Sequence, residues 1–152
     1  SAITARSALQ SVGHQYDALA ISGCDAAPGG TAGNGYFTCT EHYNGSVWST
    51  VDNVNTMRKQ FGAGGSAGDA FFAGGQSPVV GNNNITTEEY NGSTWSTRGN
   101  LNFGRRDMSG AGTTAAGLAM SGDAPGHAST EEYAGSGIYK TLKVCAVTGS
   151  QA

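Results

Sequence analysis

The stretch TEEYNGSTWST, from Thr87 to Thr97, occurs three times in this chain in related forms. A close copy, TEHYNGSVWST, spans Thr40 to Thr50, and a more distant one, TEEYAGSGIYK, spans Thr130 to Lys140. The tyrosines of the three copies are 47 and 43 residues apart. Self-similarity at such a fixed period is the signature of a repeat architecture. We therefore interpret the chain as three copies of one structural unit.

A second shared block lies upstream of each copy, over residues 5–23, 57–75 and 104–122, and these blocks align without gaps. Each block has an arginine near its start, a glycine in its middle and a glycine at its end. These residues are Arg6, Arg58 and Arg105; Gly13, Gly65 and Gly112; and Gly23, Gly75 and Gly122. All insertions fall between the two shared blocks, where we expect a loop of variable length.

Each repeat is expected to divide into four short strands. The first is rich in Gly, Ala and Ser, the second is apolar, the third ends at the repeated tyrosine, and the fourth contains the tryptophan. An Asn-Gly pair joins the last two strands at Asn44-Gly45 and Asn91-Gly92. This pair predicts a type I′ hairpin turn, in which both residues have φ > 0. Asn44, Asn91 and Asn84 also begin glycosylation sequons, but without a visible secretory signal we favour the turn.

Four strands repeated at this period predict the blades of a β-propeller. Side-chain size supports this, because small residues fill the first strand whereas Trp48 and Trp95 lie in the fourth, farthest from the crowded axis. The expected fold is all-β, with three four-stranded antiparallel blades in one repeat domain that forms a partial or oligomer-completed propeller. The expected boundaries are 1–51 for blade 1, 52–98 for blade 2, 99–146 for blade 3 and 147–152 for a C-terminal tail.

These positions resemble the kelch-type repeat, in which a Gly-Gly doublet ends the second strand and is followed by a Tyr and then a Trp. The matching residues are Gly74-Gly75, Tyr90 and Trp95; Ser22-Gly23, Tyr43 and Trp48; and Ser121-Gly122 and Tyr133, with Ile138 at the Trp position. The phrase TEEYNGSTWST is also similar to kelch-like repeats of phage and marine-microbe structural or tail-associated proteins. The resemblance covers nearly the whole chain and implies blades, but propellers serve many functions.

Three blades are fewer than the roughly 4–8 of closed propellers. Alone, they would expose the apolar outer faces of the first and last blades. Two copies could join head to tail with two-fold symmetry into a six-bladed ring. Alternatively, different partners cover the stack, or the chain, which begins at Ser1 without Met, is a piece of a longer product.

The repeated arginines are expected to form bidentate ion pairs with the glutamates that lie two residues before each tyrosine, namely Glu41, Glu88 and Glu131. This predicts a structural role for both residue types. A ring of arginines that binds an anionic ligand at the axis is the alternative.

Neither a catalytic set nor a metal or cofactor site is expected. The histidines, His14, His42 and His127, have no metal-ligand spacing. Asp17 and Asp69 precede the second strand at matching positions, where repeat three has Ala116, so we expect a dispensable structural role for them. Cys24 and Cys39 flank one predicted hairpin, and both a disulfide and two free thiols stay open; Cys145 lies apart from them.

The best candidates for binding are the loops between the second and third strands, because loops on a rigid repeat scaffold commonly carry recognition. Their sequences are CDAAPGGTAGNGYF over 24–37 and QSPVVGNNNIT over 76–86. The candidate residues are Asp25, Asn34, Tyr36, Asn82, Asn83 and Asn84.

Composition narrows the class of protein. The net charge is −3 and the 8 Lys and Arg are scattered, which argues against nucleic-acid binding. No apolar run reaches the roughly 18 residues of a membrane span. We expect a non-enzymatic structural or binding module of a larger assembly at a virion surface, as a phage capsid decoration or tail-associated protein, or in an extracellular appendage. Its partners would be protein subunits and a surface glycan. The alternatives are a cytoplasmic protein-interaction subunit and a propeller-fold carbohydrate-active enzyme.

Overall fold

The computed structural model describes residues 5–24, 35–123, 129–135 and 138–142. Within these residues the chain forms twelve β-strands and no helix. The strands make three separate four-stranded antiparallel sheets, and in each sheet the spatial order of the strands follows their order in the chain. The predicted all-β fold with three four-stranded blades is therefore confirmed.

Each sheet is a meander that lies within one of the residue ranges expected for a blade. Blade 1 contains β1 (Gln10–His14), β2 (Asp17–Ile21), β3 (Thr40–Tyr43) and β4 (Trp48–Thr50). Blade 2 contains β5 (Gly62–Ser66), β6 (Asp69–Ala73), β7 (Thr87–Tyr90) and β8 (Trp95–Thr97). Blade 3 contains β9 (Ser109–Gly112), β10 (Ala116–Met120), β11 (Thr130–Ala134) and β12 (Ile138–Leu142).

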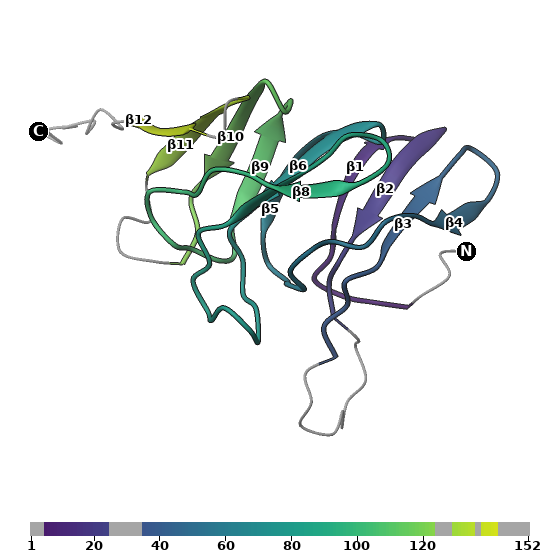
Figure 1. Cartoon of the computed structure of the whole chain (residues 1–152), viewed down its shortest axis with the longest axis horizontal. Coiled ribbons are helices and arrows are strands. Elements are labelled where there is room, and N and C mark those ends of the chain that lie inside the picture. The colour runs from purple at the N-terminus through teal and green to yellow at the C-terminus, as the bar shows by residue number, and fades with distance from the viewer. Residues whose placement is uncertain (1–4, 25–34, 124–128, 136–137, 143–152) are drawn as a thin grey trace, which may run out of the picture.

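The three blades stand side by side, with blade 2 between the other two (Figure 1). Their first strands meet, because β5 contacts β1 on one side and β9 on the other. This convergence of first strands is propeller-like, although the three sheets do not close into a ring. Among the described residues, blade 2 is consequently the only one of the three with a neighbouring blade on both faces.

Small residues on the first strands allow the blades to approach this closely. A Cβ atom added to Gly64 would lie 2.6 Å from Cε1 of Phe71 and 3.1 Å from the carbonyl carbon of Ala111 in the next blade. A Cβ atom at Gly110 would lie 2.5 Å from the backbone nitrogen of Ala63. The sequence argument from a crowded axis therefore has a direct counterpart in the packing of β5 against β9.

Two apolar clusters fill the joints between the blades. The first cluster, between blades 1 and 2, includes Leu19, Ile21, Phe61, Phe72 and Trp95. The second, between blades 2 and 3, consists of Ala73, Leu101, Met108, Ala119 and Tyr133. Adjacent residues of a strand point to opposite faces of a sheet, so Phe72 faces blade 1 whereas Phe71 faces blade 3 and stacks on Tyr133.

The hairpins between the third and fourth strands lie where they were predicted, but the type I′ turn is wrong. Gly45 and Gly92 have φ values of 90° and 89°, whereas neither Asn44 nor Asn91 has a positive φ. Instead, Oδ1 of Asn91 accepts hydrogen bonds from the backbone nitrogens of Ser93 (3.0 Å) and Thr94 (2.9 Å). The asparagine side chain thus satisfies the amides of a four-residue loop, which is the alternative use of Asn in turns.

Blade 3 also differs from its predicted alignment. Trp48 and Trp95 lie directly opposite Tyr43 and Tyr90 in their sheets. In blade 3 the residue opposite the repeated tyrosine is Tyr139, not Ile138. The β11–β12 hairpin has one more residue than its counterparts, and this insertion shifts the tryptophan-equivalent position by one.

The packing at Gly64 gives a testable prediction. We expect Gly64→Ala to lower the free energy of unfolding by about 1–3 kcal/mol, because Phe71 is held between blades and has no room to move. Gly68→Ala is the matched control, since a Cβ atom there meets nothing within 4 Å and the residue has no positive φ. Urea denaturation of both variants measures the difference, and equal midpoints would contradict the crowded-axis account.

Candidate functional site

Each repeated arginine meets the repeated glutamate of its own blade in the structure. The pairs are Arg6–Glu41, Arg58–Glu88 and Arg105–Glu131. The Nη2–Oε1 distances are 2.6 Å in blade 1 and 2.9 Å in blade 2, and the same two atoms are in contact in blade 3. No side chain of the six is more than 3% exposed. Pairing predicted from the repeat pattern therefore corresponds to three buried ion pairs.

The geometry of the pair is not the expected bidentate one. In blade 2, only Nη2 of Arg58 reaches Glu88, while Nη1 donates to the carbonyls of Gly74 (3.0 Å) and Thr86 (2.9 Å). Nε donates to the carbonyl of Thr56 at 3.2 Å. The guanidinium group therefore joins the end of β6 to the start of β7.

The other two blades repeat this arrangement. Nη1 of Arg105 donates to the carbonyls of Ser121 (3.1 Å) and Ser129 (2.8 Å). Nη1 of Arg6 donates to those of Ser22 (3.2 Å) and Cys39 (2.8 Å). The three arginine side chains are at most 3% exposed and donate to oxygens of their own blade, which favours the structural role over a ring that binds an anionic ligand.

The second carboxylate oxygen is held by an asparagine that the repeat comparison missed. Oε2 of Glu88 accepts hydrogen bonds from the backbone nitrogen (2.6 Å) and Nδ2 (3.1 Å) of Asn55. Asn102 makes the same two bonds to Glu131, at 2.7 and 2.9 Å. The signal was present in the sequence, because each asparagine lies three residues before the arginine of its repeat.

Burial changes the acidity of the central arginine without removing its charge. Desolvation lowers the pKa of Arg58 to about 10, while the charge of Glu88 and its hydrogen bond act in the opposite direction. At neutral pH the side chain therefore stays protonated and the ion pair persists. The guanidinium carbon also lies 4.7 Å from the ring centroid of Phe72, so the pair adjoins the apolar cluster between blades 1 and 2.

The joint between blades 2 and 3 combines stacking with a polar contact. We name the face of a blade that carries its repeated tyrosine the front face, and the opposite face the back face. Tyr133 on the front of blade 3 stacks on Phe71 on the back of blade 2, with ring centroids 5.5 Å apart and 23° between the planes. The Tyr133 hydroxyl donates a hydrogen bond to Oε1 of Glu89. Glu89 also accepts from Nε of Arg98 at 2.7 Å.

The joint between blades 1 and 2 uses the same orientation with different polar groups. Tyr90 and Trp95 on the front of blade 2 are 3% and 5% exposed against blade 1. Nε1 of Trp95 donates to Oγ1 of Thr40 at 3.1 Å. At the position of Glu89, blade 1 has His42, whose Nε2 lies 2.6 Å from Oδ1 of Asp17. Burial, followed by the charge of Asp52, raises the pKa of Tyr90.

Both joints share a backbone contact at the glycine that ends the second strand. The nitrogen of Gly23 donates to the carbonyl of Arg58 (3.1 Å), and that of Gly75 donates to the carbonyl of Arg105 (2.8 Å). Gly75 has φ = 91°, and a Cβ atom there would lie 2.7 Å from the carbonyl oxygen of Lys59. Glycine is therefore required at this position both by conformation and by space.

The front face of blade 1 has no covering blade within the described residues. Tyr43 and Trp48 are only partly buried, although their rings still contact each other at a centroid distance of 5.2 Å. Together with Ser46 and Val47 they line a shallow pocket. Tyr43 and Trp48 occupy the positions of Tyr90 and Trp95, which are buried in blade 2.

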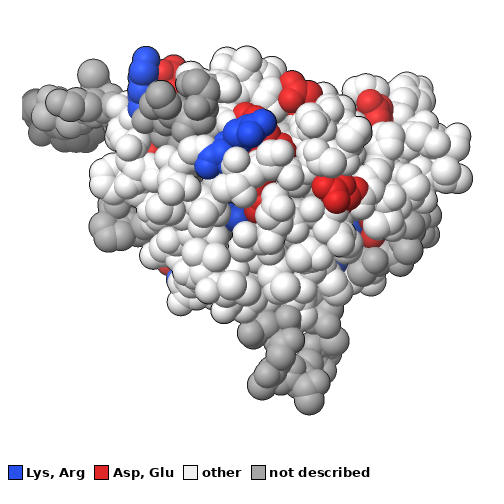
Figure 2. All heavy atoms as spheres, viewed as in Figure 1, with Lys and Arg blue, Asp and Glu red and all other residues white. Residues whose placement is uncertain are grey.

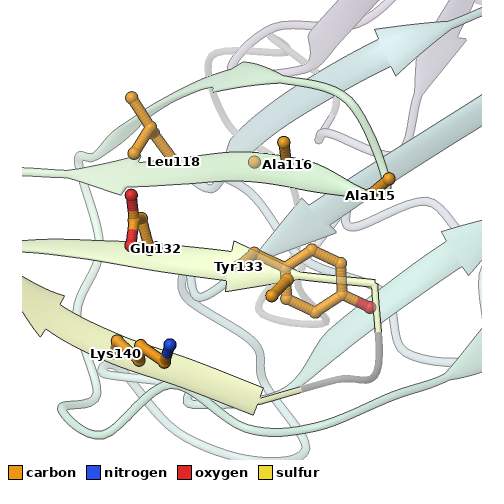
Figure 3. A pocket seen from close by; sticks show the side chains of 8 residues that line it. Ala115, Ala116, Leu118, Glu132, Tyr133 and Lys140 are labelled. Carbon is orange, nitrogen blue, oxygen red and sulfur yellow. The ribbon is translucent and has the colours of Figure 1, made fainter.

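The back face of blade 3 is likewise open to solvent in the described part of the chain. A pocket of about 390 Å³ lies there, lined mainly by residues of β10, β11 and β12. Figure 3 shows Leu118, Glu132 and Lys140 on these three adjacent strands. On blade 2 the positions of Leu118 and Glu132 are taken by Phe71 and Glu89, and Tyr133 of blade 3 covers both.

The predicted binding loops are only partly available for binding. Asp25 and Asn34 lie outside the described residues. Tyr36 contacts blade 2, with Nζ of Lys59 at 5.2 Å from its ring centroid. Asn82 and Asn83 are exposed. Asn84 is wrong as an exposed recognition residue, because it is 1% exposed.

The backbone of Asn84 is held between two other segments, because its nitrogen donates to the carbonyl of Gly75 (3.0 Å) and its carbonyl accepts from the nitrogen of Arg105 (3.3 Å). Its Oδ1 accepts hydrogen bonds from the nitrogen (2.8 Å) and Oγ1 (3.0 Å) of Thr86, which fixes the turn that precedes β7. The most exposed apolar residues of the same loop are Val79 and Val80, at 75% and 52%. The sequence comparison missed them, although an adjacent pair of valines in a Gly- and Asn-rich loop is unusual enough to be noticed.

The remaining polar candidates have structural partners or no site. Oδ2 of Asp69 accepts from Oγ1 of Thr114 in blade 3 at 2.7 Å. Cys24 and Cys39 are free thiols, and the sulfur of Cys39 accepts from Nη1 of Arg6 at 3.0 Å. His127 and Cys145 lie outside the described residues. Among the residues that the structure does describe, no group of three or more His, Cys, Asp or Glu is arranged to hold a metal ion.

Charged side chains are sparse and scattered over the face of the molecule in Figure 2, without a basic stripe. In the described ranges, no helix is long and apolar enough to cross a membrane. The fold and its joints define an all-β protein of propeller-like blades that is held together by buried arginine–glutamate pairs. No family model matches the chain, and a search of curated proteins finds no match.

The buried ion pair of blade 2 generates a stability prediction. We expect Arg58→Met to lower the free energy of unfolding by about 3–5 kcal/mol, because it leaves the Glu88 carboxylate buried without its counter-charge. The matched control is Arg98→Met, which removes a 46% exposed partner of Glu89 and should cost less than about 1 kcal/mol.

Thermal and urea unfolding followed by circular dichroism measure both variants. If the unpaired charge causes the loss, adding Glu88→Gln to the Arg58→Met variant should recover part of it. An unfolding midpoint for Arg58→Met equal to that of the parent chain would show that the pair has no structural role.

Proposed function

We propose that this chain is a non-enzymatic structural module of a larger protein assembly, built by packing blade on blade. The observation that carries the proposal is the contrast between covered and uncovered faces. Blade 2 buries Phe71 and Phe72 completely on its two faces. On the front of blade 1, Tyr43 is partly exposed, whereas its match in blade 2, Tyr90, is 3% exposed. On the back of blade 3, Leu118, the match of Phe71, is likewise partly exposed.

The use of the charged groups supports a scaffold more than a reaction site. Among the described residues, the buried Arg, Lys, Asp and Glu side chains are those of the arginine–glutamate pairs, and their polar atoms bind backbone carbonyls, backbone amides and asparagine. Such pairs tie adjacent strands to the linker that enters the blade. A catalytic carboxylate would instead need access to a substrate.

The kelch-type resemblance supports the same proposal. In blade 2 the doublet Gly74-Gly75 has two positive φ values, 69° and 91°, at the end of β6. Tyr90 and Trp95 then pair across the β7–β8 hairpin. The similarity of the phrase TEEYNGSTWST to repeats of phage and marine-microbe proteins favours a virion or extracellular appendage as the assembly, with other protein subunits as partners.

The mass in solution tests the proposal. We expect light scattering of the purified chain to give a mass above 15.3 kDa, because the open faces drive association. Negative-stain microscopy then distinguishes a regular appendage from a discrete oligomer, which would favour the interaction-subunit alternative. A stable monomer at every concentration from about 1 to 100 µM would overturn the proposal.

A further inference from the structure

We propose that the front face of blade 1 packs on the back face of blade 3 of a second copy of this chain, through the contacts that join blades 2 and 3 within one copy. This inference rests on the proposed function and names the partner and the residues of its assembly interface. The central contact is a hydrogen bond from the Tyr43 hydroxyl of one copy to the Glu132 carboxylate of the next.

The joint between blades 2 and 3 supplies the template. There, Tyr133 stacks on Phe71 and its hydroxyl donates to Glu89. Phe71 and Glu89 are directly opposite each other on β6 and β7. The back face of blade 2 therefore receives the tyrosine of the following blade with one apolar residue and one carboxylate.

Blade 3 presents the same two positions on its own back face. Leu118 and Glu132 are directly opposite each other on β10 and β11, as Phe71 and Glu89 are in blade 2. The side chain of Glu132 is exposed and has no hydrogen-bond partner among the described residues. Its position in the pocket of Figure 3 leaves the carboxylate accessible from outside the blade.

Blade 1 presents the complementary group. Tyr43 occupies the position of Tyr133, and its hydroxyl also lacks a hydrogen-bond partner within the described part of the chain. The adjacent Trp48 extends the apolar surface, as Trp95 does at the joint between blades 1 and 2, where it is 5% exposed. One chain thus has an unused donor at one end and an unused acceptor at the other.

The pattern of acceptors favours a second copy over an unrelated partner. The equivalent residue in blade 1, His42, is already paired with Asp17 and lies at the joint with blade 2 of the same chain. In blade 2 that residue, Glu89, is already used by Tyr133. The free acceptor therefore occurs on the terminal blade, where the tyrosine of a following blade would arrive.

The first strands of the proposed joint differ from those of the joint between blades 2 and 3. At the internal joint, Gly110 of β9 faces β5, whose own facing position is Gly64. The corresponding residues at the new joint are Ser11 on β1 of one copy and Ala111 on β9 of the other. Both are small and exposed, but each carries a Cβ atom where the joint between blades 2 and 3 has glycine, so β1 and β9 of neighbouring copies would lie farther apart than β5 and β9 of one copy. Two copies joined at both ends make a six-bladed ring, within the roughly 4–8 blades of closed propellers.

Charge exchange with complementation tests the interface. Glu132→Lys replaces the acceptor of the Tyr43 hydroxyl by a cation, and Tyr43→Glu brings a second carboxylate opposite Glu132. Each variant alone is therefore expected to associate at least tenfold more weakly than the parent chain. In an equimolar mixture, the lysine introduced in one variant meets the glutamate introduced in the other, and the second joint of the ring is unchanged. The mixture should therefore recover a mass of twice 15.3 kDa by light scattering.

Asp123→Lys and Val80→Glu are the matched controls, because they make the same kinds of change at exposed positions away from both faces. They should associate like the parent chain. Tyr43→Phe removes only the hydroxyl donor, Glu132→Gln removes only the charge of the acceptor, and both guard against misfolding of the harsher variants. We expect Tyr43→Phe to weaken association about tenfold, which is typical of a bond to a charged group. Glu132→Gln should weaken association less, because the amide oxygen still accepts the hydrogen bond. Circular dichroism verifies that every variant is folded.

Three results would count against the inference. If the parent chain is monomeric, the proposed function fails as well. If the parent chain associates but the four interface variants associate equally well, only the interface is wrong and the assembly uses another surface. If folded single variants are monomeric and their mixture stays monomeric, the two faces do not meet each other in a second copy.

Discussion

A four-stranded sheet that is apolar on both faces needs a neighbour on each side, and most features of this protein follow from that requirement. Phe71 and Phe72 are adjacent on β6, point to opposite faces and are both completely buried. No single sheet can bury both residues, because successive side chains of a strand alternate between its faces. Repetition of the blade supplies the neighbours, and the glycines of β5 and β9 allow the neighbours to come close enough.

Different interactions stabilise each blade internally and join one blade to the next. Within a blade, strands of three to five residues form few ladder hydrogen bonds, and the buried arginine adds bonds to the carbonyls at the ends of two strands. Between blades, aromatic stacking and apolar burial dominate. The linker asparagines Asn55 and Asn102 connect neighbouring blades. Each lies in the segment that follows one blade and donates hydrogen bonds to the buried glutamate of the next.

Sequence reasoning succeeded where the repeats constrain backbone and residue type together. The period, the four strands of each blade and the pairing of Arg58 with Glu88 were all readable from three aligned copies. Sequence reasoning failed where a side chain makes hydrogen bonds that allow a different backbone conformation from the one usual for its residue type. The Asn91 side chain bonds two loop amides and removes the need for a positive φ at that residue.

Two further differences come from information that alignment alone does not contain. One extra hairpin residue brings Tyr139 opposite Tyr133, which only strand register reveals. Asn84 looked like an exposed loop residue, but backbone hydrogen bonds to Gly75 and Arg105 hold it in the interior.

The open back face of blade 3 differs in composition from the buried back face of blade 2. Leu118 replaces Phe71, and Lys140 lies where blade 2 has Ser96, so the exposed back face is less aromatic and more charged than its buried counterpart. Such a face is tolerated in water before association, and it should bind a neighbour less strongly than the internal joints do, so the blades of one chain would fold together before chains assemble.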